Sequence, residues 1–189
     1  MYFDEDIINC VKVLNEGGII LYPTDTVWGL GCDPTNEEAI SKIFKLKQRS
    51  ESKSMIILVA DESDILNYTN QPSVKIYDYI KGIHKPTTVI YQHAKNLSPK
   101  VIAEDGSVAI RVVKDKFCQE LIKAFGKPLV STSSNISGYP APPLFRDIDI
   151  LIKNGVDYTV RYRQDEDTPS EPSAIVKINE DGSYVTIRT

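Results

Sequence analysis

Residues 17–49 read GGIILYPTDTVWGLGCDPTNEEAISKIFKLKQR, and this stretch decides the fold. Its apolar run at 19–21 is rich in β-branched residues and predicts a strand covered on both faces. A loop dense in hydroxyls follows, with one carboxylate at Asp25, and then a helix that ends on the cations Lys47 and Arg49. A buried strand, a polar loop and a basic helix end can together form one wall of a pocket that handles phosphate.

The length and composition indicate a soluble globular protein. A chain of 189 residues is long enough for one domain with a substantial core and short for two, so we expect a single domain over residues 1–189. Hydrophobic residues make up 41% and charged residues 25%, in the ordinary globular range. No apolar run reaches the length of a membrane span, which predicts no membrane partner and a cytoplasmic location.

The net charge of −4 argues against a nucleic-acid binder whose affinity comes from bulk neutralisation of phosphates. It does not exclude a local basic cavity. Cys10, Cys32 and Cys118 show no C-x-x-C spacing, and His84 and His93 are isolated, so a zinc site is improbable. Three buried thiols in a reducing compartment are expected instead.

Hydrophobic periodicity predicts an α/β class with a mixed sheet. A capping box at Thr35 and Glu38 predicts the start of the second helix. Residues 138–143, GYPAPP, are interpreted as a stiff loop and not as a linker. The predicted helices cover residues 4–16, 36–46, 62–67, 73–81, 115–125 and 145–153, and the predicted strands cover 19–21, 55–59, 87–91, 108–112, 129–130, 158–162, 174–178 and 184–187.

Several residues have both a functional and a plain structural interpretation. Lys47 and Arg49 suit a triphosphate, but cations are also common at helix C-termini, and the residues alone favour that plainer interpretation. The loop at 131–138, STSSNISG, offers donors to an anion or is an ordinary polar turn. Asp25 could support a metal, orient a hydroxyl or cap a turn, whereas Trp28 is assigned to packing. No P-loop, dinucleotide fingerprint or G-x-S-x-G elbow occurs.

Four motifs occur together and in order: YPTDTVWGLG at 22–31, KQR at 47–49, VAIR at 108–111 and STSSNISG at 131–138. Together they resemble the YrdC/TsaC family, the threonylcarbamoyl-AMP synthases that start the t6A modification of tRNA. The resemblance covers nearly the whole chain. It implies a short, single-domain type with a twisted mixed sheet, flanking helices and a deep, positively lined cavity.

The resemblance also implies an activity. Members of the family combine L-threonine, bicarbonate and ATP into threonylcarbamoyl-adenylate and release pyrophosphate. Mg²⁺ would travel with the ATP, and no residue is carried over as a metal ligand. A transferase complex would then pass the threonylcarbamoyl group to adenosine 37 of tRNA. The protein would act as a monomer or a homodimer.

Site residues follow from the motifs that match the family. The resemblance implies catalytic roles for four residues: Lys47, Arg49, Ser133 and Asn135. It implies that the same four residues, together with Thr88, Arg111 and Ser173, contact ATP or the adenylate. It also implies that threonine is contacted by Thr24, Thr26, Arg111 and Ser137. Lys47→Ala or Arg49→Ala is expected to leave the fold intact and abolish adenylate formation.

Departures from the family pattern leave alternatives open. Trp28 replaces the usual tyrosine or phenylalanine, His84 and Lys85 replace a proline and a glycine, and Leu58 stands where longer relatives place a histidine. One alternative is a non-catalytic module that binds double-stranded RNA or tRNA in the same cavity. Another is a paralogue with an altered substrate.

Overall fold

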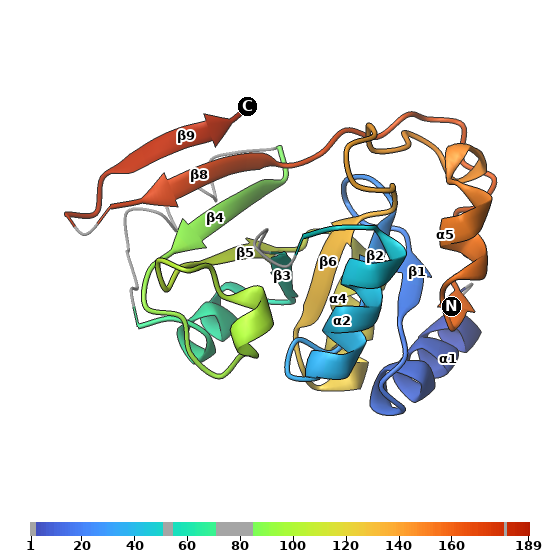
Figure 1. Ribbon diagram of the computed structural model, residues 1–189, viewed down its shortest axis with the longest axis horizontal. Helices are drawn as coiled ribbons and strands as arrows, with labels where there is room; N and C mark the ends of the chain where they lie inside the picture. The colour runs from blue at the N-terminus through green and yellow to red at the C-terminus, as the bar shows by residue number, and fades with distance from the viewer. Residues whose placement is uncertain (1–2, 51–54, 71–84, 180) are drawn as a thin grey trace.

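The computed structural model describes residues 3–50, 55–70, 85–179 and 181–189, arranged around one large mixed sheet (Figure 1). The helices are α1 (Asp4–Asn15), α2 (Glu37–Leu46), α4 (Lys116–Phe125) and α5 (Ile150–Asn154), with 3₁₀ segments η1 (Glu62–Asn67), η2 (Pro99–Val101) and η3 (Phe145–Asp147). The strands are β1 (Ile20–Tyr22), β2 (Gly29–Gly31), β3 (Ile56–Val59), β4 (Thr87–Tyr91), β5 (Val108–Val112), β6 (Leu129–Ser133), β7 (Tyr158–Thr159), β8 (Ala174–Ile178) and β9 (Tyr184–Arg188).

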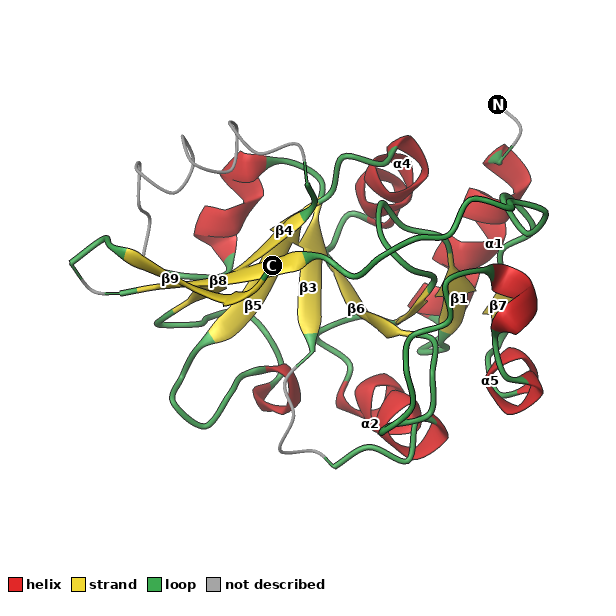
Figure 2. Ribbon diagram, turned by 90° about the horizontal axis from the view of Figure 1, so that it is seen from above, coloured by secondary structure: helices red, strands yellow, loops and turns green. Residues whose placement is uncertain are grey.

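The sheet has nine strands in the order β7-β1-β2-β6-β3-β5-β4-β8-β9. The pairs β1/β7, β3/β5 and β4/β8 are parallel, and the other neighbouring pairs are antiparallel. Figure 2 shows the twist of the sheet, with α4 and α2 on opposite faces. The predicted α/β class with a twisted mixed sheet and flanking helices is therefore confirmed. No helix among the described residues is long and apolar enough to cross a bilayer.

Close packing of two strands explains the glycines of the GLG segment. A Cβ on Gly31 would lie 2.6 Å from Cε1 of Tyr22, a fully buried side chain of the neighbouring strand. A Cβ on Gly29 would lie 3.1 Å from the Ser131 hydroxyl. Glycine at these positions lets β2 approach both the Tyr22 ring and β6, so the apolar centre of the sheet closes without a void.

Predicted packing roles hold for the cysteines and for the tryptophan. Cys10, Cys32 and Cys118 are buried free thiols, and burial raises the pKa of each. Trp28 is buried and packs against Phe145 with ring centroids 4.7 Å apart. Neither observation gives these side chains a chemical role.

The predicted capping box at Thr35 is wrong. Helix α2 is capped by Asn36, whose side-chain oxygen accepts a hydrogen bond from the backbone N–H of Ala39 at 3.0 Å. The Thr35 hydroxyl instead donates to the Asp33 carboxylate at 2.6 Å. A stronger acceptor two residues upstream thus removes Thr35 from the cap.

The structure also corrects three of the predicted spans. The helix predicted over 145–153 is wrong as one element, because Asp149 caps a separate helix, α5, by accepting from Leu151 N–H at 2.8 Å. Strand β7 is shorter than predicted, because the N–H groups of Arg161 and Tyr162 donate to the buried Asp6 carboxylate and not to a neighbouring strand. Strand β6 extends to Ser133, which pairs with Gly29. The helix predicted at 73–81 lies outside the described residues.

Candidate active site

A cavity of about 430 Å³ lies on the sheet between β2 and β9. Its lining includes three arginines and no carboxylate among the described residues. The described lining residues are Thr26, Val27, Gly29, Arg49, Met55, Ile56, Ile90, Ala109, Arg111, Ser131, Thr132, Ser133, Asn135, Tyr139, Ala141, Pro172, Ser173, Ile175 and Arg188. Guanidinium groups and hydroxyl donors around one space suit an anionic ligand.

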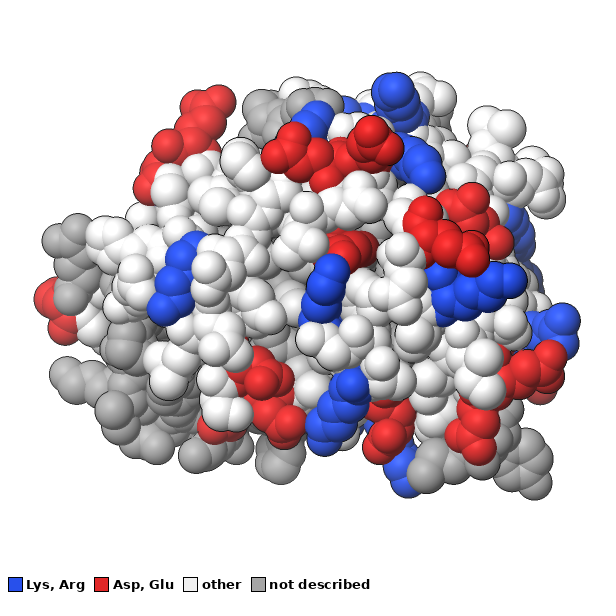
Figure 3. Space-filling view, turned by 90° about the horizontal axis from the view of Figure 1, so that it is seen from below, with Lys and Arg blue, Asp and Glu red and all other residues white. Residues whose placement is uncertain are grey.

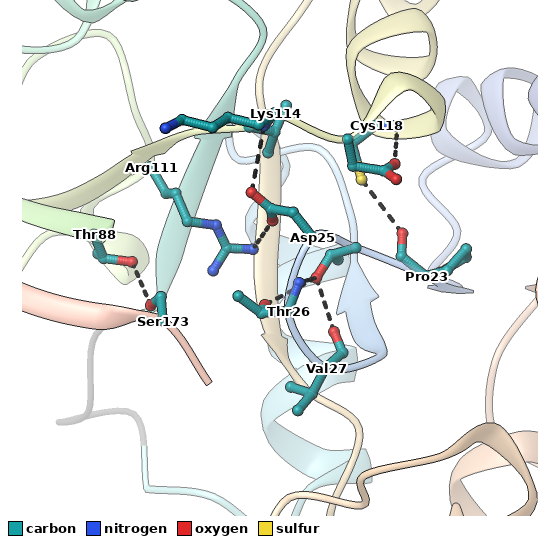
Figure 4. A network of polar contacts seen from close by, with 12 residues as sticks. Pro23, Asp25, Thr26, Val27, Thr88, Arg111, Lys114, Cys118 and Ser173 are labelled. Atoms are coloured by element: carbon teal, nitrogen blue, oxygen red, sulfur yellow. Dashed lines mark hydrogen bonds and ion pairs between the residues drawn. The ribbon is translucent and has the colours of Figure 1, made fainter. Parts of the chain in front are cut away.

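Arg111 is the most buried of the three arginines, with 3% of its side chain exposed. It projects from β5, and its Nη2 lies 3.1 Å from Oδ1 of Asp25 in the β1–β2 loop (Figure 4). Within the described part of the chain, its Nε and Nη2 have no hydrogen-bond partner. Nη2 is already in the ion pair with Asp25, but a buried Nε–H is normally satisfied, so this open donor in a cavity wall indicates a place for an anion.

Arg188 is a cavity residue that the sequence analysis did not identify. Its Nε and Nη2 donate to the Ser173 carbonyl at 2.9 and 2.7 Å. Burial, and after it the charge of Arg111, lowers the pKa of Arg188, and burial lowers that of Arg49. The only signal in the sequence is the register of the hairpin, in which Arg188 pairs with Ile175, two residues after Ser173. Arg188 itself lies one position beyond the end of the strand predicted at 184–187.

Lys47 lies behind the cavity wall. Only 1% of it is exposed, and its ammonium donates to the carbonyls of Ser133 and, at 2.6 Å, of Asn135. The Lys47 carbonyl in turn accepts from Ser137 N–H at 2.7 Å. The plain interpretation of Lys47 as a solvated charge is therefore wrong. Through these hydrogen bonds Lys47 acts as a clamp that ties the end of α2 to the loop after β6. Direct contact of Lys47 with ATP stays a prediction.

Ser133 and Asn135 form the polar floor beside that clamp, and both line the cavity. The Ser133 hydroxyl donates to the side-chain oxygen of Asn135. The amide nitrogen of Asn135 donates to the carbonyls of Ile136 at 2.9 Å and Tyr139 at 2.7 Å. These hydrogen bonds hold the Asn135 amide in one orientation. Groups that stabilise charge developing in a transition state need to be fixed in advance in this way.

The predicted hydroxyl residues occur in pairs, one at the cavity and one behind it. Thr26 lines the cavity, and its hydroxyl shares a hydrogen bond of 2.9 Å with that of buried Thr24. Ser173 lines the cavity and shares a bond of 2.8 Å with buried Thr88 (Figure 4). Thr24 and Thr88 are thus placed to orient hydroxyls that can reach a ligand. Ser137 is not among the lining residues.

The structure therefore brings together six of the ten predicted site residues at the cavity itself: Thr26, Arg49, Arg111, Ser133, Asn135 and Ser173. Lys85 is not among the described lining residues, and its ammonium is 3.8 Å from the exposed carboxylate of Glu171. His84 lies outside the described residues. Leu58 is buried in β3.

A second hollow of about 510 Å³ adjoins the cavity and shares Asn135, Tyr139 and Ala141 with it. Its described lining comes largely from the proline-rich loop at 139–143 and carries no lysine or arginine. Tyr139 stands at the boundary with 70% of its surface exposed. The two spaces thus differ in charge: the described lining of the first holds three arginines, and that of the second holds Asp147 and Asp149 and no cation.

Anion affinity should depend on the protonation of Lys47. Burial, and after it the charge of Arg49, lowers the pKa of Lys47 to about 7, so the group is cationic below that pH and neutral above it. Sulfate stays a dianion over this range. We expect its dissociation constant to rise roughly 3- to 10-fold between about pH 6 and about pH 9, as one positive charge beside the cavity is lost.

Calorimetric titration of sulfate into the protein measures this change. Lys47→Met should flatten the profile, and an unchanged profile in that variant would contradict the assignment.

Comparison with known proteins now adds to this geometry. Residues 12–189 match the model of the Sua5/YciO/YrdC family, described as "Telomere recombination". The chain is 37% identical over 138 residues to the threonylcarbamoyl-AMP synthase of Saccharophagus degradans, covering 71% of each chain. The chain belongs to the Sua5/YciO/YrdC family. It is also 37% identical over 134 residues to the synthase of Vibrio campbellii, covering 69% of this chain and 72% of that one.

Solved structures of Sua5 and YciO have the same fold. P. abyssi Sua5 complexed with L-threonine superposes with a TM-score of 0.84 at 22% identity, over 97% of this chain and 54% of that chain. E. coli YciO superposes with a TM-score of 0.83 at 22% identity, over 97% of this chain and 88% of that chain. At these identities the likeness establishes the fold alone.

Proposed function

We propose that this protein is a threonylcarbamoyl-AMP synthase, which forms threonylcarbamoyl-adenylate and pyrophosphate from L-threonine, bicarbonate and ATP. The observation that carries the proposal is the cavity itself. Arg49, Arg111 and Arg188 line it, its described lining holds no carboxylate, and the buried Nε of Arg111 has no hydrogen-bond partner in the described chain. The names of the relatives that match over about two thirds of the chain support the same activity.

The chemistry needs charge stabilisation and positioning, and no protein nucleophile. The threonine amine and bicarbonate condense to a carbamate with loss of water. A carbamate oxygen then attacks the α-phosphorus of ATP, and the bond to pyrophosphate breaks. The three thiols are buried with raised pKa values, which agrees with a reaction that uses no thiolate. The guanidinium groups and the fixed hydrogen-bond donors of the cavity therefore position the substrates and stabilise the charge that develops.

Each part of the cavity has a role in this proposal. Arg49 and Arg188 neutralise the charge that builds on the leaving pyrophosphate, and Arg111 holds an anionic group of the substrates. Ser133 and Asn135, behind which Lys47 is clamped, hold phosphate or carbamate oxygens. Thr26 and Ser173, backed by Thr24 and Thr88, orient the amino acid and the nucleotide, while Ser137 keeps its predicted place near threonine. The adenosine lies along the adjoining hollow, which lacks cations in its described lining and presents Tyr139.

Mg²⁺ enters this scheme as part of MgATP. The carboxylate of Asp25, beside the cavity, pairs with Arg111 and accepts a hydrogen bond from Lys114 N–H at 3.3 Å. The described residues hold no group of three or more side chains that could bind a metal ion. This donor set does not fit a resident metal site, so phosphates and water would supply the magnesium ligands.

The same proposal covers the setting of the protein. Its adenylate would pass to a separate transferase complex that modifies adenosine 37 of tRNA, in the cytoplasm. Residues 1–189 would form one domain, because strands from both ends of the described chain join one sheet. Whether the protein acts as a monomer or a homodimer stays open to measurement by sedimentation.

Binding of double-stranded RNA or tRNA stays an untested alternative. Figure 3 shows acidic and basic side chains interspersed over one face of the molecule, without a broad field of one sign. The net charge of −4 also gives no general attraction for phosphate backbones. Tight RNA binding that weakens steeply with salt, without pyrophosphate release, would favour this alternative.

The proposed activity is tested by omitting one substrate at a time. Pyrophosphate release from ATP should require both L-threonine and bicarbonate, and it should fall to background when either is left out. Pyrophosphate release with serine or valine in place of threonine shows whether the protein recognises both the methyl group and the hydroxyl of threonine. Pyrophosphate release that ignores the amino acid, or none with all three substrates present, would reject the proposal.

A further inference from the structure

Asp25 is a carboxylate that contacts the cavity arginine Arg111. Its side chain is 9% exposed, and its two oxygens have different partners. Oδ1 lies 3.1 Å from Arg111 Nη2, and Oδ2 accepts from the backbone N–H of Lys114 at 3.3 Å (Figure 4). The carboxylate thus joins the β1–β2 loop to the end of β5.

This placement runs against simple anion binding. A negative charge beside a cationic cavity repels an anionic ligand, so Asp25 lowers the affinity that the three arginines would otherwise give. Asp25 belongs to no group of three described side chains that could bind a metal ion, and neither of its contacts is to a hydroxyl. A function for Asp25 at this position must therefore come through Arg111.

Arg111 depends on Asp25 for its orientation. The ion pair between its Nη2 and Asp25 is a short polar contact of the guanidinium, and its Nε has no hydrogen bond in the described part of the chain. Packing restrains the stem of a side chain that is 3% exposed, but the carboxylate of Asp25 directs its Nη2, so removal of the carboxylate frees the guanidinium plane to rotate. Small misplacements of a group that holds a reacting substrate lower turnover strongly.

We propose that Asp25 is a positioning residue, which fixes the guanidinium plane of Arg111 so that its open donors face an anionic group of the substrate. The inference rests on the proposed function, because the group that Arg111 meets is taken from that reaction. It predicts two effects of opposite sign. Loss of the carboxylate raises the positive charge of the cavity and preserves or tightens binding of a simple anion, while turnover falls.

The test compares Asp25→Ala and Asp25→Asn with the unaltered protein. For Asp25→Ala we expect kcat for pyrophosphate release to fall roughly 100-fold, while the dissociation constant for inorganic pyrophosphate stays the same or decreases. Asparagine keeps one acceptor oxygen, so Asp25→Asn should lose roughly 10-fold. In an Arg111→Ala background, Asp25→Ala should cause little further loss of kcat, since the group that it orients is gone.

Asp33 offers a matched control. Its side chain is also 9% exposed, and it also pairs with a cation, Lys127 at 2.6 Å, but that cation, unlike Arg111, does not line the cavity. Asp33→Ala should remove a comparable ion pair and leave kcat unchanged. A kcat for Asp25→Asn or Asp25→Ala within twofold of the unaltered value would overturn the inference. Equal losses of pyrophosphate binding and of kcat would overturn it as well, since they indicate a general structural defect.

A second readout is independent of activity. The Nε–H signal of Arg111, assigned by its loss in Arg111→Lys, should be sharp and slow to exchange in nuclear magnetic resonance spectra. It should broaden or exchange rapidly in Asp25→Asn. An unchanged signal would contradict the positioning role. If the unaltered protein released no pyrophosphate, the proposed function would fail, and this signal would still decide the role of Asp25.

Discussion

Replacing Arg49 with alanine is expected to lower kcat/KM for pyrophosphate release by roughly 10²- to 10³-fold, the loss typical of one preorganised group that stabilises developing charge. Arg49 is half-buried and lines the cavity just beyond α2. We expect the free energy of unfolding to change by less than about 1 kcal/mol, because the side chain is not part of the apolar core. Initial-rate kinetics and urea unfolding measure the two quantities.

Two further variants separate charge from geometry at this position. Arg49→Lys keeps the charge and loses the planar fork, so it should recover only part of the lost activity. Lys45→Ala removes an exposed cation from the same helix end and should leave the kinetics unchanged. Equal losses in Lys45→Ala and Arg49→Ala would contradict a local role for Arg49, because they would indicate a diffuse electrostatic effect.

Replacing Lys47 with alanine is expected to lower both stability and activity. The substitution removes a fully buried side chain and leaves the carbonyls of Ser133 and Asn135 without their donor. We expect the free energy of unfolding to fall by about 2–5 kcal/mol and kcat/KM to fall by at least roughly 100-fold. The structure thus replaces the expectation of an intact fold that came from the sequence. Chemical unfolding and steady-state kinetics on the same preparation check both effects.

Lys47→Met serves as the matched control. Methionine fills most of the space but offers no donor, so the free energy of unfolding should fall by only about 1–3 kcal/mol. Activity should fall nearly as far as in Lys47→Ala, because the Ser133–Asn135 loop loses its clamp in both variants. A Lys47→Ala protein with unchanged stability and no activity would instead place the ammonium on the substrate.

The elements that could be predicted from sequence are those that local pattern decides. Runs of β-branched residues at 87–91 and 108–112 predicted β4 and β5 to the residue, and Asp115 before an amphipathic run predicted α4. The errors come from contacts made over long distances in the chain. Strand β7 ends early because the Asp6 carboxylate, more than 150 residues away, takes the N–H groups of Arg161 and Tyr162.

For the candidate site, too, local sequence pattern predicted part of the arrangement and long-range contacts decided the rest. Matching motifs predicted which residues gather, but spacing along the chain does not tell whether a side chain faces the cavity or supports one that does. Thr24, Thr88 and Lys47 are buried behind Thr26, Ser173 and the Ser133–Asn135 loop, respectively. Arg188 was missed because its place depends on the pairing of β9 with β8, which no local pattern contains.

The most direct test of the central claim is to identify the product formed from ATP, L-threonine and ¹³C-labelled bicarbonate. The account predicts threonylcarbamoyl-AMP that carries one ¹³C atom, detected by mass spectrometry, in an amount equal to the pyrophosphate released. It also predicts that this product disappears in Arg49→Ala and persists in Lys45→Ala. Pyrophosphate release with no labelled adenylate, or an adenylate of threonine without the carbamoyl carbon, would contradict it.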